Sequence, residues 1–197
     1  MNSMAPSVVA EAIKLEKERR SASASLYEFV RQSWHVVEPG VPFVASWHIQ
    51  EICEHLEAIS AGDIRKLLIN IPPRHSKSTI VSVIWPMWEN AKQRFENSET
   101  GYRIATSVGG TATGEGGSRL LLDDPHAAQE AQSDAIRESS IDWFDQVWST
   151  RLNDPKLDAM VCVMQRLHEQ DISGHILEDI GGWEHLMIPA EWGAGSG

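Results

Sequence analysis

The sequence predicts an α/β domain with a mostly parallel sheet flanked by helices. Short apolar runs alternate with longer segments whose apolar residues recur every three or four positions, a pattern of strands followed by helices. With 197 residues, the chain is long enough for one domain with its own core. Its 42% hydrophobic content is ordinary for a globular protein. No run approaches the roughly 18 apolar residues of a membrane span, so we expect no membrane partner.

The first part of the chain predicts three helices. Charged residues of both signs alternate at helical spacing in the first, and Phe29, Val30 and Trp34 share one face of the second. Ser46 is the expected N-cap of the third. A break is expected at residues 21–25, where only small residues occur, and a turn at 38–42. The three helices are predicted at residues 6–21, 26–37 and 46–59.

The rest of the chain predicts strands separated by helices. The apolar runs that read as strands are Leu67–Ile71, Tyr102–Val108, Leu120–Leu122, Met160–Met164 and His185–Ile188. Helices are expected at residues 78–90, 127–150 and 170–179, and a glycine-rich stretch at 109–117. We therefore divide the chain into a helical N-terminal segment (1–45), an α/β domain (46–192) and a flexible tail (193–197).

Charge and cysteine content narrow the function classes. The net charge of −11 argues against a nucleic-acid binder that works by bulk electrostatics, although a motor that touches DNA through a few basic residues remains compatible. Cys53 and Cys162 lack metal-ligand spacing, so we expect two reduced, buried thiols. The charged N-terminus does not resemble a secretory signal, which favours a cytosolic protein.

Residues 67–79 have the layout of a phosphate-binding loop. A buried strand ends, a polar loop follows, and the loop closes on Lys77, Ser78 and Thr79 before a helix, where backbone N–H groups and a lysine can receive a triphosphate. Lys77 is expected to reach the β- and γ-phosphates and Ser78 to bind magnesium. Taken alone, the pattern fits an ordinary strand-to-helix turn with an exposed lysine equally well.

The loop departs from the standard pattern G-x-x-x-x-G-K-[ST]. Ile71 and Ser76 occupy the two glycine positions. Pro72 and Pro73 carry no N–H group, so the backbone from His75 through Ser76, Lys77 and Ser78 to Thr79 must form the cradle. If Ser76 takes a positive φ, the cost relative to glycine is about 1–2 kcal/mol.

A second apolar run, Leu120–Leu122, ends in two acids. Adjacent carboxylates at a strand end repel each other, and a bound metal ion would offset that repulsion, so the pair favours a metal site. Asp123 is the expected magnesium ligand, and Asp124 stands where many ATPases place an acid that polarises the attacking water. The alternative is a simple turn before Pro125. Together the two motifs predict an ATP-handling domain of the P-loop type.

Four segments, in this order, resemble the ATPase domain of the large terminase subunit of tailed bacteriophages. They are Pro72–Ser78, Ala105–Gly110 leading into the glycine-rich stretch, Leu121–His126 and Val163–Asp171. The resemblance runs from about Trp47 to Trp192 and implies a P-loop ATPase fold of the additional-strand type.

The resemblance also implies roles for particular residues. Arg74 is implied to contact the γ-phosphate and to stabilise the transition state, and Gln165 and Arg166 to couple hydrolysis to movement. For His168 and the residue after it we prefer the start of a helix. Trp47 and its neighbour stand where the family often reads adenine, although core packing explains Trp47 equally well.

The implied cofactors are ATP and Mg²⁺, and the implied activity is ATP hydrolysis that drives double-stranded viral DNA into proheads. The implied partners are double-stranded DNA, a small terminase subunit, the portal of the prohead and other copies in a homo-oligomeric ring. The implied location is the cytoplasm of a bacterial host.

Two departures from the family leave other functions open. Relatives have several dozen more residues between the phosphate loop and the acidic pair, including a strand of the sheet, and its loss is expected to expose a sheet edge. No spaced acidic cluster replaces their downstream nuclease domain, so we expect no DNA cleavage by this chain. The first alternative is a catalytically inactive remnant that binds nucleotide or a partner. The second is another P-loop motor such as a helicase, which residues 164–166 disfavour.

Overall fold

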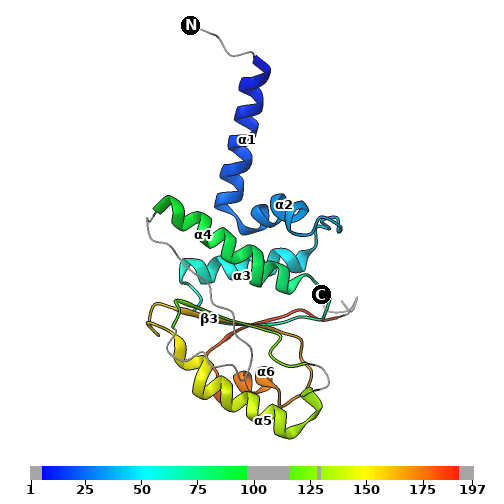
Figure 1. The fold of residues 1–197 in the computed structure, drawn as a ribbon, viewed down its shortest axis with the longest axis vertical. Coiled ribbons are helices and arrows are strands. Elements are labelled where there is room, and N and C mark those ends of the chain that lie inside the picture. Colours follow the sequence, from blue (N-terminus) through cyan, green and yellow to red (C-terminus); the bar gives the residue numbers. More distant parts are fainter. Residues whose placement is uncertain (1–5, 97–115, 128–129, 191–197) are drawn as a thin grey trace, which may run out of the picture.

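The computed structural model describes residues 6–96, 116–127 and 130–190, and within them the chain forms an α/β fold (Figure 1). The predicted strand at 102–108 and most of the glycine-rich stretch at 109–117 lie outside the described residues. Among the described helices, none is both long enough and apolar enough to cross a membrane.

The helices are α1 (Pro6–Ala24), α2 (Leu26–Val37), α3 (Trp47–Ala61), α4 (Trp85–Glu96), α5 (Asp134–Trp143) and α6 (Ile172–His175). Shorter or wider helical turns are η1 (Thr79–Ile84), η2 (Glu130–Gln132), η3 (Phe144–Trp148), η4 (Ser149–Arg151) and η5 (Ile176–Ile180). The strands are β1 (Lys66–Asn70), β2 (Arg119–Asp123), β3 (Ala159–Met164) and β4 (Glu184–Met187).

All four described strands are parallel, in the order β2-β3-β1-β4. The chain therefore leaves β1, forms β2 two places away, and returns to place β3 between them. Leu68 of β1 pairs with Cys162 of β3, which in turn pairs with Leu122 of β2. Because the strands are parallel, all of their carboxyl ends lie at one edge of the sheet.

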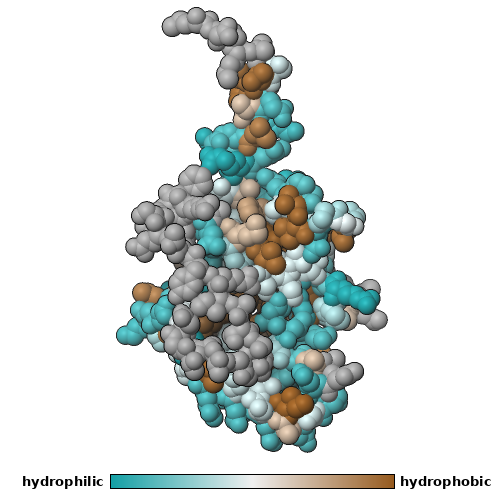
Figure 2. Space-filling view, in the orientation of Figure 1, coloured by the Kyte–Doolittle hydropathy of each residue, from teal (hydrophilic) through white to brown (hydrophobic). Residues whose placement is uncertain are grey.

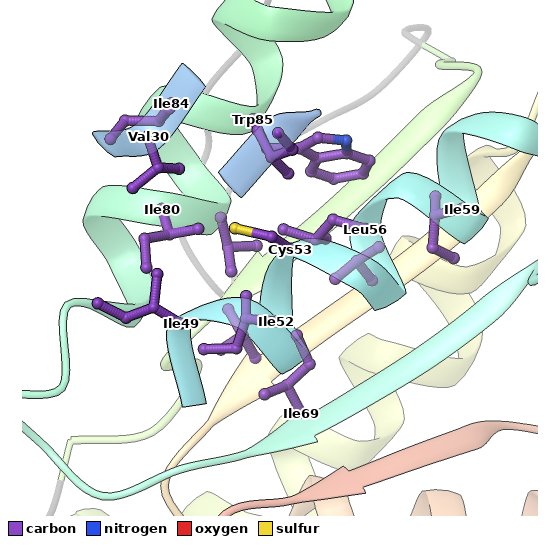
Figure 3. Close-up of a cluster of buried hydrophobic side chains, with 14 of the residues drawn as sticks. Val30, Ile49, Ile52, Cys53, Leu56, Ile59, Ile69, Ile80, Ile84 and Trp85 are labelled. Atoms are coloured by element: carbon purple, nitrogen blue, oxygen red, sulfur yellow. The ribbon is translucent and has the colours of Figure 1, made fainter. Parts of the chain in front are cut away.

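Helices cover both faces of the sheet, and successive strand residues supply two separate cores. Helices α2, α3 and α4 lie over one face, and α5 and α6 over the other (Figure 1). In β1, Leu67 and Ile69 pack with the first group, whereas Leu68 packs with the second. Figure 3 shows the first core, in which Ile52 and Ile80 are fully buried. Each such aliphatic side chain stabilises the fold by about 1.5–3 kcal/mol.

Within the described residues, the expected helices and strands are confirmed apart from their limits. The amphipathic segment at 26–37 is a helix with the predicted bounds, and Leu26, Val30 and Trp34 form its buried face. The break predicted at 21–25 is wrong for most of its length, because α1 continues to Ala24. Only Ser25 interrupts the helices, and its hydroxyl accepts the N–H of Glu28 as the N-cap of α2.

Two other predicted helices differ from the observed ones in their limits or continuity. The helix predicted at 78–90 reaches Glu96. The one predicted at 127–150 is divided into η2, α5, η3 and η4. Ser46 is the N-cap of α3 by position, but its side chain makes no cap hydrogen bond and lies 2.5 Å from Nδ1 of His48.

Helix α1 projects from the body of the molecule (Figure 1). Apolar side chains on it stay in solvent, including Val9 and Ile13, which are 42% and 52% exposed (Figure 2). Helix α2, in contrast, contributes Leu26 and Val30 to the same core as β1.

Candidate functional site

The loops that follow β1, β2 and β3 meet at the carboxyl edge of the sheet. Asn70 ends β1, Asp123 ends β2 and Met164 ends β3. The strand order places the end of β3 between the other two. Crevices at this edge of an open parallel sheet are the usual ligand sites of α/β proteins.

The loop after β1 has the backbone of an anion-binding turn. Arg74 and Ser76 have positive φ angles of 64° and 59°, so the expected strain at Ser76 is present. Lys77 and Ser78 are already helical, and the N–H of Ile80 donates to the carbonyl of Ser76 at 3.0 Å. A left-handed residue followed by right-handed ones turns successive N–H groups toward one point, and that concavity binds anions.

Lys77 is buried and ion-paired with the second acid of the pair. Its side chain is 6% exposed, and Nζ lies 2.7 Å from Oδ1 of Asp124. The N–H of Gln165 donates to the same carboxylate oxygen at 3.2 Å. The side chain of Asp124 is 39% exposed, so solvent reaches it. Its backbone has a positive φ of 43°. A buried amine beside an accessible carboxylate is well placed to exchange that partner for the phosphate of a ligand.

Asp123 is held by two hydroxyl groups from the helix after the loop. Oγ of Ser78 donates to Oδ1 at 2.9 Å, and Oγ of Ser82 donates to Oδ2 at 2.5 Å. Ser82 was missed by the sequence analysis, although its position four residues after Ser78 puts both hydroxyls on one helix face. Mg²⁺ in nucleotide sites is bound by one or two carboxylates, a hydroxyl and phosphate oxygens, and Asp123 with Ser78 fits this donor set.

Within the described residues, no group of three or more His, Cys, Asp or Glu side chains is arranged to hold a metal ion by itself. Magnesium that arrives with a nucleotide takes several of its ligands from phosphate groups and water.

The remaining loop residues lie at the surface. Nδ1 of His75 is 2.8 Å from the carbonyl oxygen of Pro73, and its ring meets the ring of His48 edge-on at 5.4 Å. Burial, together with the nearby His75, lowers the pKa of His48. Trp47 is 46% exposed, so the core-packing interpretation of Trp47 is wrong. The hydroxyl of Thr79 donates to Oε1 of Glu38 at 2.9 Å, which ties the loop to the end of α2.

The segment after β3 contacts the site through its first residue. Gln165 reaches Asp124 through its N–H. The guanidinium of Arg166 donates to the carbonyl of Glu169 at 3.2 Å, within its own segment. The helix does not start at His168 or Glu169 as we preferred. It starts at Ile172, where Asp171 is the N-cap and accepts the N–H of Gly174.

Three buried side chains outside the site, two thiols and one imidazole, have pKa values that burial shifts. Cys53 and Cys162 are free and buried, as expected. Burial raises the pKa of the Cys53 thiol to about 12, and it raises the pKa of Cys162 as well. His126, two residues after the acidic pair, is 3% exposed, and neither ring nitrogen has a hydrogen-bond partner among the described residues. Burial lowers the pKa of His126, which favours the neutral ring.

Comparison with known proteins adds no assignment: no protein-family model matches the chain, and a search of curated proteins finds no significant match. The function must therefore be argued from the site.

Proposed function

We propose that this chain is a P-loop ATPase domain of the kind found in the large terminase subunits of tailed bacteriophages. The observation that carries the proposal is a double pairing: consecutive loop residues Lys77 and Ser78 contact the consecutive acids Asp124 and Asp123. Ser78 and Asp123 are 45 positions apart in the chain. An ordinary surface turn gives no reason for these four side chains to meet.

The order of the strands supports the same proposal. P-loop ATPases of the additional-strand type have one strand between the strand before the phosphate loop and the strand before the acidic pair. Here β3 lies between β1 and β2 in the parallel sheet. The ends of all three strands then lie next to one another at one edge of the sheet, and the Gln165 N–H after β3 donates to Asp124 after β2.

The residues have distinct tasks in the proposed reaction. Lys77 exchanges Asp124 for the β- and γ-phosphates, and the N–H groups of residues 75–79 bind phosphate oxygens. Ser78 and Asp123 would hold Mg²⁺, which neutralises phosphate charge. Asp124, freed from Lys77, orients the attacking water. Arg74, exposed at the loop, is the proposed partner of the developing γ-phosphate charge.

The proposed biological setting follows from the resemblance alone. It comprises translocation of double-stranded DNA into a prohead, with a small terminase subunit and portal as partners, in a homo-oligomeric ring in the bacterial cytoplasm. The inactive remnant is the second candidate. It is favoured by the position of β2 at an edge of the described sheet, where Leu120 and Leu121 stay partly exposed.

Mg²⁺-dependent ATP turnover by the wild type, Lys77→Ala and Lys156→Ala tests the proposal. Lys156 is an exposed lysine in the connection before β3 and serves as the matched control. Loss of one preorganised phosphate contact lowers turnover by about 100-fold or more. We expect this loss for Lys77→Ala and none for Lys156→Ala. Equal, negligible rates from three folded proteins would favour the remnant.

A further inference from the structure

We propose that Asp171 is a positioning residue for the ATPase site, acting on Asp124 through the segment after β3. The inference rests on the proposed function for its catalytic consequence, but its structural part can be tested without ATP. Asp171 ends the motif segment Val163–Asp171, but the sequence assigns it no role of its own.

Asp171 is fully buried and its two carboxylate oxygens have different tasks. Oδ1 accepts the N–H of Gly174 at 3.0 Å and so caps α6. Oδ2 accepts the N–H groups of Leu167 at 2.9 Å and of His168 at 3.3 Å. Nε of Arg166 lies 4.0 Å from Oδ1. These donors stabilise a buried negative charge that would otherwise be costly.

A helix cap alone does not explain an acid at this position. Serine and asparagine cap helices about as well as aspartate, and neither carries a charge to bury. What aspartate adds is a second acceptor oxygen, which fixes the backbone of residues 167 and 168 against the start of α6. The segment is therefore held at its far end by Asp171.

The near end of the same segment is fixed to β1. Nδ2 of Asn70, which is buried, donates to the carbonyl of Met164 at 3.3 Å and to Oγ of Ser173 at 2.8 Å. The fit is close, because a Cβ added to Gly174 would overlap the carbonyl oxygen of Glu169. Residues 165–169 are thus clamped between the end of β3 and the start of α6.

The clamped segment presents one backbone group to the site, the N–H of Gln165 on Oδ1 of Asp124. In the structure Lys77 shares that oxygen. Once Lys77 turns to a phosphate, the Gln165 N–H is the remaining described hydrogen bond to the Asp124 side chain. Displacing the segment would therefore misplace the water-orienting acid without touching the phosphate loop.

Asp171→Ser separates the two tasks, because serine keeps the helix cap and removes the second oxygen. We expect backbone amide hydrogen exchange at Gln165 and Leu167 to accelerate at least tenfold, while Gly174 stays protected. We also expect kcat to fall about tenfold or more, since small misplacements can cost up to about 100-fold, with ATP affinity within about twofold of the wild type.

Ser25→Ala is the matched control, since it removes the N-cap of α2, far along the chain from the site. It should lower the Tm of the protein and leave kcat and Gln165 exchange unchanged. Wild-type exchange at Gln165 in Asp171→Ser would overturn the inference, as would a parallel loss of kcat and ATP affinity. A wild type without turnover would refute the proposed function instead, and the exchange result would still decide the role of Asp171.

Discussion

Replacing Ser76 with glycine should stabilise the protein, contrary to the usual effect of glycine. Ser76 has a φ of 59°, in the left-handed region. A residue with a side chain pays about 1–2 kcal/mol for that conformation, whereas glycine loses about 0.5–1 kcal/mol more backbone entropy on folding. The difference predicts a gain of about 0.5–1 kcal/mol, which corresponds to a rise in Tm of about 1–4 °C for a domain of this size.

Urea unfolding followed by tryptophan fluorescence measures this change in the free energy of unfolding. Ser76→Val is the opposing control, because a β-branched residue at positive φ is strained further and should destabilise the protein. The reasoning is refuted if Ser76→Gly is no more stable than the wild type and the free energy of unfolding of Ser76→Val equals the wild-type value. Such a result would mean that the loop backbone is not left-handed at this residue.

Three further predictions concern the surroundings of the site. Gly174→Ala should lower the free energy of unfolding by more than about 2 kcal/mol, because the added Cβ would overlap the carbonyl oxygen of Glu169. Gly40→Ala is the control: a Cβ there has no atom within 4 Å, so its free energy of unfolding, measured in urea like that of Gly174→Ala, should be close to the wild-type value. His126→Leu should raise the free energy of unfolding by about 1 kcal/mol, because it removes two buried ring nitrogens that have no hydrogen-bond partner among the described residues. A lower Tm for this variant would contradict the prediction. Two carboxylates bonded to His175 outweigh its burial and raise its pKa. Protonated His175 therefore stabilises the fold fully below its pKa in the unfolded chain, about 6.5, and this contribution is lost as the pH rises through the higher pKa of the folded protein. His175→Gln should lower the free energy of unfolding more at pH 5.5 than at pH 8.5.

Local patterns predicted most of the fold. The apolar face of residues 26–37 predicted both ends of α2 correctly, and the apolar runs predicted the positions of β1 and β3. The sequence also marked Ser76 as the position where a positive φ would be costly, because serine occupies a standard glycine position, and the structure has a positive φ there. These features depend on neighbours in the chain, which a sequence displays directly.

The missed features depend on residues that meet only after folding. Asn70 reads as one strand residue, yet its amide joins β3 to α6. Asp171 falls at the start of the helix predicted at 170–179, and nothing in the local pattern shows that its side chain is fully buried. The sequence left Trp47 open between adenine recognition and core packing, and its exposure at the start of α3 excludes the second interpretation.

The most direct test of the central claim is the affinity for a non-hydrolysable ATP analogue, measured by calorimetry with and without Mg²⁺. If one triphosphate lies between Lys77 and Asp123, Mg²⁺ should strengthen binding to the wild type by about tenfold or more, and Asp123→Asn should remove most of that gain. Binding to the wild type that ignores Mg²⁺, or a folded wild type that binds no analogue, would contradict the account.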